Sequence, residues 1–138
     1  MSDESVLFEV DDMGVALITL NRPDQMNACS GDLLERLAAA YTRCDEDDDI
    51  RAVVVTGAGR AFCAGADMSD AAKTFDIESS GSFEDFSAAG CAVPAFSIRK
   101  LVVAAVNGHA IGLGMTLAMQ CDVRIFAREG KYGIVQVR

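Results

Sequence analysis

The chain carries at residues 53–67 the stretch VVVTGAGRAFCAGAD, in which a short apolar run gives way to a turn that contains glycine. A second stretch, LVVAAVNGHAIGLG at residues 101–114, repeats this pattern. Short continuous apolar runs bounded by turn residues are typical of strands in the interior of a parallel sheet. Each stretch therefore predicts a strand buried on both faces, followed by a turn at which backbone N–H groups become free.

The segments around these stretches alternate between strand and helix patterns. Residues 7–10 and 15–20 are β-rich runs on either side of a short turn that ends in glycine, which predicts a hairpin. Ser30 can cap a helix whose apolar positions recur at helical spacing from Leu33 to Cys44. Strand–helix–strand alternation favours an α/β fold with right-handed crossovers.

Charge and turn residues predict further boundaries. The acidic run at residues 45–49 is expected to end the first helix in a solvated loop, since negative charge opposes the dipole at a helix C-terminus. Pro94 is expected to open a helix through residues 97–100. A short apolar helix is expected over residues 114–120, and a third strand over residues 121–126.

The composition is that of one globular domain, with 51% hydrophobic and 24% charged residues among 138. Lys and Arg number 12 and Asp and Glu number 21, so the net charge of −9 argues against nucleic acid and anionic membranes as partners. No apolar run approaches a membrane span, and the N-terminus has no apolar signal core. We therefore expect a soluble, cytoplasmic or matrix-type protein with no nucleic-acid or membrane partner.

The five cysteines are widely spaced, odd in number and contain no C-x-x-C pair. This pattern indicates neither a disulfide framework nor a zinc site. We expect free, buried thiols in a reducing compartment, and no metal site.

The glycine turns themselves suggest carbonyl chemistry. A dinucleotide-binding G-x-G-x-x-G would need glycine where Phe62 stands, and the chain has no phosphate-binding loop and no nucleophile elbow. Two backbone donors that converge on one carbonyl oxygen would instead stabilise an enolate or a tetrahedral oxyanion. For either segment alone, the alternative is a tight turn with no chemical role.

Three motifs in order carry a specific resemblance: NRP at residues 21–23, FCAGAD at residues 62–67 and AVNGHAIGLG at residues 105–114. Together with CDVRI at residues 121–125, they resemble the crotonase (enoyl-CoA hydratase/isomerase) superfamily. The resemblance implies a crotonase-like (ClpP/crotonase) α/β fold of repeated ββα units. Because family members are longer, residues 1–138 are expected to be the N-terminal part of an acyl-CoA-binding domain, truncated before the C-terminal helical region.

The resemblance also implies roles for individual residues. By position, the backbone N–H groups of Ala66 and Leu113 match the family's oxyanion hole, and the backbone around Ala64 matches the part that contacts the CoA adenine. The substrate-binding positions implied in this way are Ala64, Gly65, Asp67 and Gly112. No cofactor is implied beyond coenzyme A as part of an acyl-CoA substrate, and the full-length protein is expected to form a homotrimer or a dimer of trimers.

The acid–base positions depart from the family. Hydratases of the family carry glutamates at the positions that are Thr116 and Gln136 here, and a glutamine side chain cannot act as a general base. The expected function is that of a hydratase- or isomerase-type enzyme that works on an enoyl-CoA or acyl-CoA thioester through an enolate. The alternative is a non-catalytic acyl-CoA-binding homologue that lacks both glutamates.

Other side chains are candidates for the missing proton transfer. The acids considered are Asp67, Asp70, Glu84 and Asp85. The alternative for Asp67 is a solvent-facing residue at the start of a helix. His109, the only histidine, is a candidate base, and the alternative is a role in structural packing. Asp122 is expected to accept hydrogen bonds from turn amides, and Cys63 to fill the core.

Overall fold

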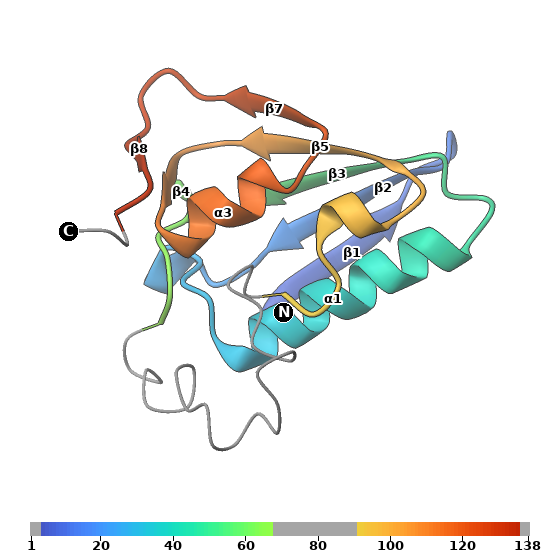
Figure 1. Ribbon diagram of the computed structural model, residues 1–138, viewed down its shortest axis with the longest axis horizontal. Coiled ribbons are helices and arrows are strands. Elements are labelled where there is room, and N and C mark those ends of the chain that lie inside the picture. The colour runs from blue at the N-terminus through green and yellow to red at the C-terminus, as the bar shows by residue number, and fades with distance from the viewer. Residues whose placement is uncertain (1–3, 68–90, 136–138) are drawn as a thin grey trace.

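The structure is a computed structural model that describes residues 4–67 and 91–135 (Figure 1). Its larger sheet has five strands in the order β1-β2-β3-β5-β7. These strands are β1 (Val6–Val10), β2 (Val15–Leu20), β3 (Ala52–Gly57), β5 (Leu101–Val106) and β7 (Val123–Phe126). The first two form the expected antiparallel hairpin, and all other neighbours in this sheet are parallel.

A smaller, fully parallel sheet has the order β4-β6-β8. Its strands are β4 (Ala61–Cys63), β6 (His109–Ile111) and β8 (Tyr132–Gly133). Each follows a strand of the larger sheet, so β3–β4, β5–β6 and β7–β8 repeat the same step between the two sheets. Helices α1 (Gly31–Glu46) and α3 (Leu113–Met119) follow the pairs β1–β2 and β5–β6, which confirms the α/β fold of ββα units.

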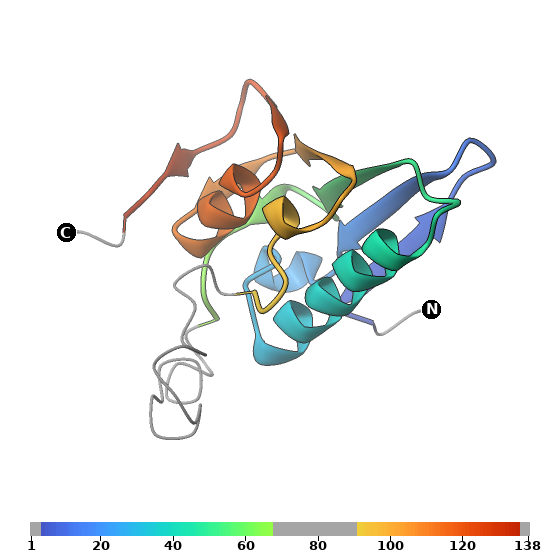
Figure 2. The same cartoon turned by 45° about the vertical axis from the view of Figure 1, so that its right-hand side comes forward.

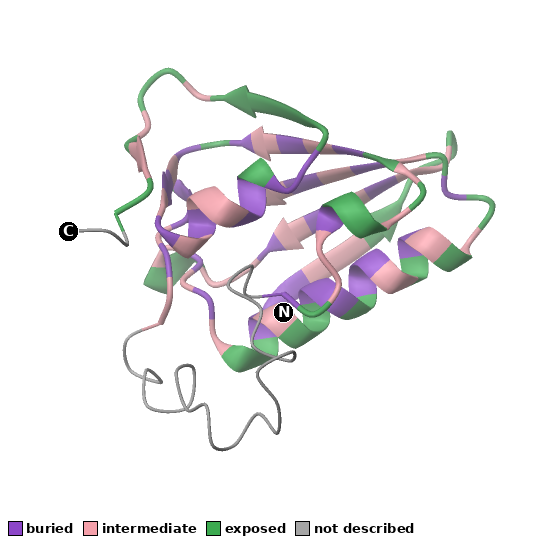
Figure 3. Ribbon diagram, in the orientation of Figure 1, coloured by how far each residue is buried: buried purple, intermediate pink, exposed green. Residues whose placement is uncertain are grey.

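Helix α1 lies alongside β1 and β2 of the larger sheet (Figures 1 and 2). The Ser30 hydroxyl accepts the Leu33 N–H at 3.1 Å, which confirms the predicted N-cap. Buried and exposed residues alternate along the helix at helical spacing (Figure 3). The apolar positions predicted from Leu33 to Cys44 are buried, except Leu34, which is half-buried.

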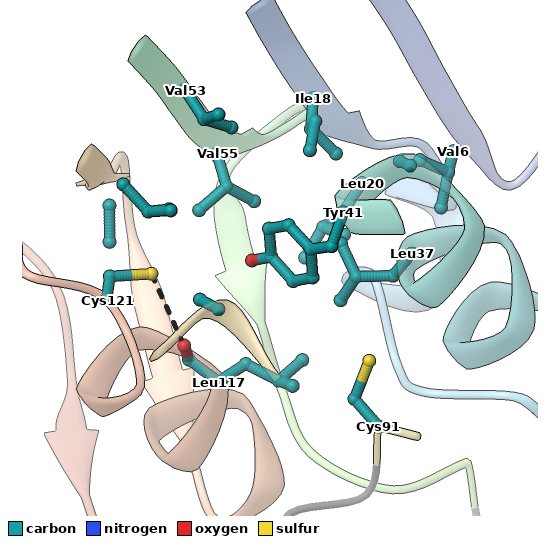
Figure 4. Close-up of a cluster of buried hydrophobic side chains, with 14 of the residues drawn as sticks. Val6, Ile18, Leu20, Leu37, Tyr41, Val53, Val55, Cys91, Leu117 and Cys121 are labelled. Carbon is teal, nitrogen blue, oxygen red and sulfur yellow. Dashed lines mark hydrogen bonds between the residues drawn. The ribbon is translucent and has the colours of Figure 1, made fainter. Parts of the chain in front are cut away.

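The core forms where α1 meets alternate residues of the parallel strands (Figure 4). Val53 and Val55 of β3 are buried and pack in one cluster with Ile18 and Tyr41. Val54 between them is only half-buried. The prediction that this strand is buried on both faces is therefore wrong, because the described residues fully cover only one face of it.

The segment after Pro94 is shorter than predicted. It forms one 3-10 turn, Ala95–Ser97, and Ile98 is already extended, at φ −90° and ψ 155°. The prediction of a helix through residues 97–100 is therefore wrong. Instead of continuing a helix, the Arg99 backbone N–H donates to Asp45 Oδ1 at 2.8 Å, a long-range contact with the end of α1.

The acidic run is not wholly a loop. Asp45 belongs to the last turn of α1, and the backbone N–H of Arg99 and its side chain hold the pKa of that carboxyl below its usual range. The Lys100 ammonium donates to the carbonyl oxygens of Asp47 at 2.8 Å and Ile50 at 2.6 Å. The sequence pattern missed these two cations because they arrive from a segment some fifty residues later.

Strand β7 begins two residues later than predicted. The Asp122 N–H donates to the Val102 carbonyl at 2.9 Å, and Asp122 Oδ2 accepts the Val102 N–H at 2.8 Å. Asp122 is thus a structural acceptor as predicted, but the amide it accepts from belongs to strand β5 and not to a turn. It ties the start of β7 to β5. No helix of the described ranges is long and apolar enough to cross a membrane.

Candidate functional site

The two glycine turns lie side by side in the structure. Strands β4 and β6 are parallel neighbours, with Cys63 paired to Ala110, so the turns that follow them leave the same edge of the small sheet. We call residues 64–67 the first turn and residues 111–114 the second turn. A methyl group added at Gly114 would lie 2.0 Å from the Cys63 carbonyl oxygen, so the second turn approaches the end of β4, directly before the first turn, closely enough to require glycine.

The first turn is hydrogen-bonded along the segment 26–29. The Cys29 N–H donates to the Gly65 carbonyl at 2.8 Å, and the Asp67 N–H donates to the Cys29 carbonyl at 2.9 Å. Gly65 has φ +114°, a conformation that side chains with a Cβ rarely adopt. The glycine therefore lets the chain change direction while Ala64, Gly65 itself and Asp67 stay bonded to residues 26–29.

The direction of the Ala66 N–H follows from these bonds. The Gly65 carbonyl and the Ala66 N–H belong to one planar trans peptide and point in opposite directions. Because the Gly65 carbonyl faces Cys29, the Ala66 N–H faces away from Cys29. No hydrogen bond from this N–H to another described residue is present.

The second turn has a different construction. The Gly112 N–H donates to the Gly133 carbonyl of β8 at 2.9 Å, and Gly112 has φ +58°. Helix α3 begins at Leu113, and its first internal bond runs from the Thr116 N–H to the Gly112 carbonyl at 3.1 Å. The Leu113 N–H is one of the donors that a helix leaves unpaired in its first turn. Over the described ranges, this N–H meets no acceptor.

Asp67 does not face solvent, and its carboxylate is paired with a cation. Its Oδ2 lies 2.9 Å from Arg22 Nη2, and the two side chains are only 14% and 20% exposed. Asp67 itself lies outside any helix. The predicted solvent-facing position is therefore wrong, since the charge of Arg22 draws the carboxylate inward.

The remaining candidates in the described part of the chain, Thr116 and His109, are both hydrogen-bonded to backbone groups. The Thr116 hydroxyl donates to the Gly112 carbonyl at 3.3 Å, as threonines inside helices often do. His109 Nδ1 accepts the Lys131 backbone N–H at 2.9 Å, which supports its structural reading. Four predicted residues lie outside the described ranges, namely Gln136, Asp70, Glu84 and Asp85.

All five cysteines are free and buried, as predicted. Cys29 and Cys63 lie behind the first turn, with their sulfurs 3.3 Å apart. The hydrogen bond to Cys63 and burial hold the pKa of the Cys29 thiol well above its usual range. Cys29 is therefore a neutral thiol, and Cys63 is the predicted core filler.

The described residues contain no group of three His, Cys, Asp or Glu side chains that could hold a metal ion.

Sequence reasoning missed Arg22 and Asn27, which support the first turn. Asn27 is fully buried and has φ +55°, and its amide donates to the carbonyls of Ala58 at 2.9 Å and Ala61 at 2.8 Å. Asn tolerates the left-handed conformation better than most residues, which is the one local signal that could have singled it out. For Arg22, the motif NRP signals a turn but not a partner 45 residues away.

Comparisons with known proteins agree with this architecture. A family model described as enoyl-CoA hydratase/isomerase matches residues 11–138. A Mycobacterium bovis protein named "Probable enoyl-CoA hydratase echA8" is 39% identical over 139 residues, which cover 100% of this chain and 52% of that protein. The 1,2-epoxyphenylacetyl-CoA isomerase of Escherichia coli is 36% identical over 138 residues, or 94% of this chain and 50% of that enzyme.

A solved structure shows the same similarity in three dimensions. The crystal structure of "a probable enoyl-CoA hydratase/isomerase" from Mycobacterium abscessus aligns with a TM-score of 0.81 and 48% sequence identity. The alignment covers 95% of this chain and 49% of that one. The chain thus spans about half the length of the relatives it matches.

Proposed function

The chain belongs to the enoyl-CoA hydratase/isomerase family, and we propose that it forms the thioester-binding part of an enzyme that acts on acyl-CoA or enoyl-CoA substrates. The observation that carries this proposal is the juxtaposition of the two turns. Each contributes a backbone N–H, of Ala66 or of Leu113, that no described residue accepts. Two such donors at one edge of a sheet suit a single carbonyl oxygen.

The proposed chemistry is stabilisation of an enolate. When a proton leaves or reaches the α-carbon of a thioester, negative charge develops on the thioester oxygen. Backbone N–H groups that are already oriented stabilise that charge without reorganisation, and losing one donor of this kind typically raises the barrier by about 3–4 kcal/mol. Hydration and isomerisation both fit such a cradle, so the donors define the class of reaction and leave the individual reaction open.

The runner-up is an acyl-CoA binder with no turnover. The observation that favours it is Thr116, which stands where hydratases of the family carry a glutamate and whose hydroxyl is bonded to the Gly112 carbonyl. A binder would keep the two donors and lack the acid. Under the catalytic proposal, the acid–base group belongs to a part of the protein outside the described ranges.

The test removes one donor and leaves the helix intact. Leu113 is the first residue of α3, a position where proline is well tolerated, so Leu113→Pro deletes the N–H with little cost to the helix. The matched control Leu113→Ala removes the side chain and keeps the N–H. Both variants are made in the complete protein that its gene encodes, and turnover of crotonyl-CoA and of a 3-enoyl-CoA is followed by the absorbance of the conjugated thioester.

We expect Leu113→Pro to lower kcat about 100- to 1,000-fold relative to Leu113→Ala. Equal turnover by the two variants would contradict the oxyanion role. Tight binding of CoA thioesters by the unaltered protein, with no turnover of any thioester, would favour the binder.

The assembly and location expected from the sequence extend the proposal. We propose a homotrimer or a dimer of trimers in the cytoplasm, with no cofactor besides the coenzyme A of the substrate. Light scattering on the complete protein measures its mass in solution, and a monomer would contradict the proposed assembly.

A further inference from the structure

We infer that Arg22 is a positioning residue for the proposed oxyanion site, because its guanidinium both orients and polarises the Ala66 N–H through two hydrogen-bonded peptides. The inference rests on the proposed function, since it assigns a role to Arg22 in the same reaction. Its geometry can nevertheless be tested without turnover.

The guanidinium of Arg22 holds two groups at once. Its Nη2 lies 2.9 Å from Asp67 Oδ2, and its Nη1 donates to the Ala28 carbonyl at 2.5 Å. Both charged side chains are largely withdrawn from water, so solvent screens this pair less than a surface pair. The planar guanidinium presents two nitrogens to two acceptors in a fixed geometry, whereas the ammonium of lysine is a compact charge with rotatable donors.

Two peptide groups, joined by one hydrogen bond, connect the Ala28 carbonyl to the Ala66 N–H. The Ala28 carbonyl and the Cys29 N–H belong to one planar peptide, and that N–H donates to the Gly65 carbonyl at 2.8 Å. The Gly65 carbonyl and the Ala66 N–H belong to the next. A guanidinium bonded to the first carbonyl therefore constrains the orientation of the Ala66 N–H at the far end.

The same chain carries polarisation. Hydrogen bonds in series strengthen one another, and a positive charge at the first acceptor makes each following N–H a better donor. The ion pair with Asp67 fixes the residue on the other side of Ala66. Arg22 thus acts on both neighbours of the proposed donor.

The base of the Arg22 side chain is itself held in place. The Arg22 backbone N–H donates to Asn27 Oδ1 at 2.7 Å, and the Asn27 N–H donates to the Arg22 carbonyl at 2.9 Å. Asn27 is anchored in turn to two carbonyls near β4, those of Ala58 and Ala61. The guanidinium therefore starts from a rigid frame, as a positioning group must.

The experiment compares Arg22→Met, Arg22→Lys and Asp67→Asn in the complete protein with a matched surface pair. The control is Arg36→Met, which breaks an ion pair with Asp32 at 3.0 Å in which the side chains are 45% and 61% exposed. Two quantities are measured: kcat and KM for thioester turnover, and the amide proton shift of Ala66 in the free protein labelled with ¹⁵N-alanine.

We expect Arg22→Met to lower kcat about 10- to 30-fold with KM changed by less than about threefold, because the donor acts in the transition state. The Ala66 amide proton should move upfield as it loses polarisation. Arg22→Lys should recover part of the kcat, and Asp67→Asn should lose less than Arg22→Met. Arg36→Met should change neither quantity.

A wild-type kcat together with an unmoved Ala66 amide in Arg22→Met would overturn the inference alone. Absence of thioester turnover in the unaltered protein would instead overturn the proposed function, and the Ala66 amide would still decide the inference. If Arg22→Met does not fold, Arg22→Lys and Asp67→Asn decide it by the same two measurements.

Discussion

The first and second turns present similar N–H groups but are held by different forces. The first turn is held by polar groups, namely the Arg22–Asp67 ion pair and the backbone bonds to Cys29. The second turn is held by close packing, since Gly114 lies against the Cys63 carbonyl and the helix behind it buries Leu117. One donor therefore depends on charge and hydrogen bonding, and the other on the absence of a side chain.

This difference predicts which substitutions each turn tolerates. A turn that is held by packing should fail when a single methyl group is added. A turn held by a polar network should fail when a polar partner is removed.

Gly114→Ala should be the most damaging change to the second turn. The added methyl group would lie 2.0 Å from the Cys63 carbonyl oxygen and 2.8 Å from the Cys63 Cβ, so the two turns must separate. We expect the free energy of unfolding to fall by about 3 kcal/mol or more. Urea denaturation of the complete protein, followed by circular dichroism, measures this loss.

The matched control is Gly31→Ala, at the first residue of α1. A methyl group there meets nothing within 4 Å, so the substitution should stabilise the protein by about 0.4–1 kcal/mol. If the two variants were equally stable, the second turn would not be held by packing.

Asn27→Ala should damage the first turn through its polar frame. The substitution leaves the carbonyls of Ala58 and Ala61 without the side-chain amide that now donates to them. We expect a loss of about 2–3 kcal/mol in the free energy of unfolding, because the fully buried side chain makes three hydrogen bonds, two to these carbonyls and one from the Arg22 N–H, and all three are lost. Urea titration of this variant beside Asn21→Ala gives the comparison.

Asn21 is a suitable control because its amide makes one exposed hydrogen bond, to the Glu4 carbonyl at 3.0 Å. Its replacement should cost about 0.5 kcal/mol or less. A similar cost for both asparagines would show that the frame of the first turn is not polar in origin.

Alkaline pH should lower the free energy of unfolding through the thiol of Cys121, which lies just after α3. Burial raises the pKa of the Cys121 thiol to about 12 from a usual value of 9.0. Above pH 9 the unfolded chain loses this proton while the folded protein keeps it, so stability falls as pH rises, until the folded thiol also ionises. The slope should reach about 1 kcal/mol per pH unit.

Cys121→Ala should therefore flatten the decline in unfolding free energy between pH 9 and pH 11. Cys44, on the face of α1 toward the core, offers the matched case, since burial raises its pKa to about 11. The contribution of Cys44 to the decline in unfolding free energy should therefore end about one pH unit lower than that of Cys121. Denaturation curves at a series of pH values would contradict the prediction if the slope were the same with and without Cys121.

Local patterns predicted most of the elements near the site. The hairpin, the cap at Ser30 and the strand at β5 follow from periodicity and turn chemistry that extend over a few residues. The position of Asp122 before a strand was enough to predict its role as an acceptor for backbone amides. The prediction of a helix after Pro94 was wrong because the Arg99 N–H is bonded to Asp45. Asp45 lies 54 residues earlier in the chain, so a pattern read from neighbouring residues cannot reveal it.

The candidate site shows the same division. The motifs placed the two turns, because glycine and small residues mark close backbone approach wherever they occur. The expected donor roles of Ala66 and Leu113 came from the resemblance to the family. They did not identify the partner of Asp67, which lies 45 residues earlier in the chain. They also did not show which face of β3 is open, since this depends on which elements pack against the strand.

The amino-acid sequence was enough to determine the α/β class and the positions of the two glycine turns after their strands. These properties follow from interactions between near neighbours, which every copy of such a pattern shares. The tertiary structure alone decided that the turns meet at one edge of the small sheet and that Arg22 reaches both Ala28 and Asp67. Those contacts depend on how parallel strands align across long stretches of chain, and the residues of one segment do not encode the position of another.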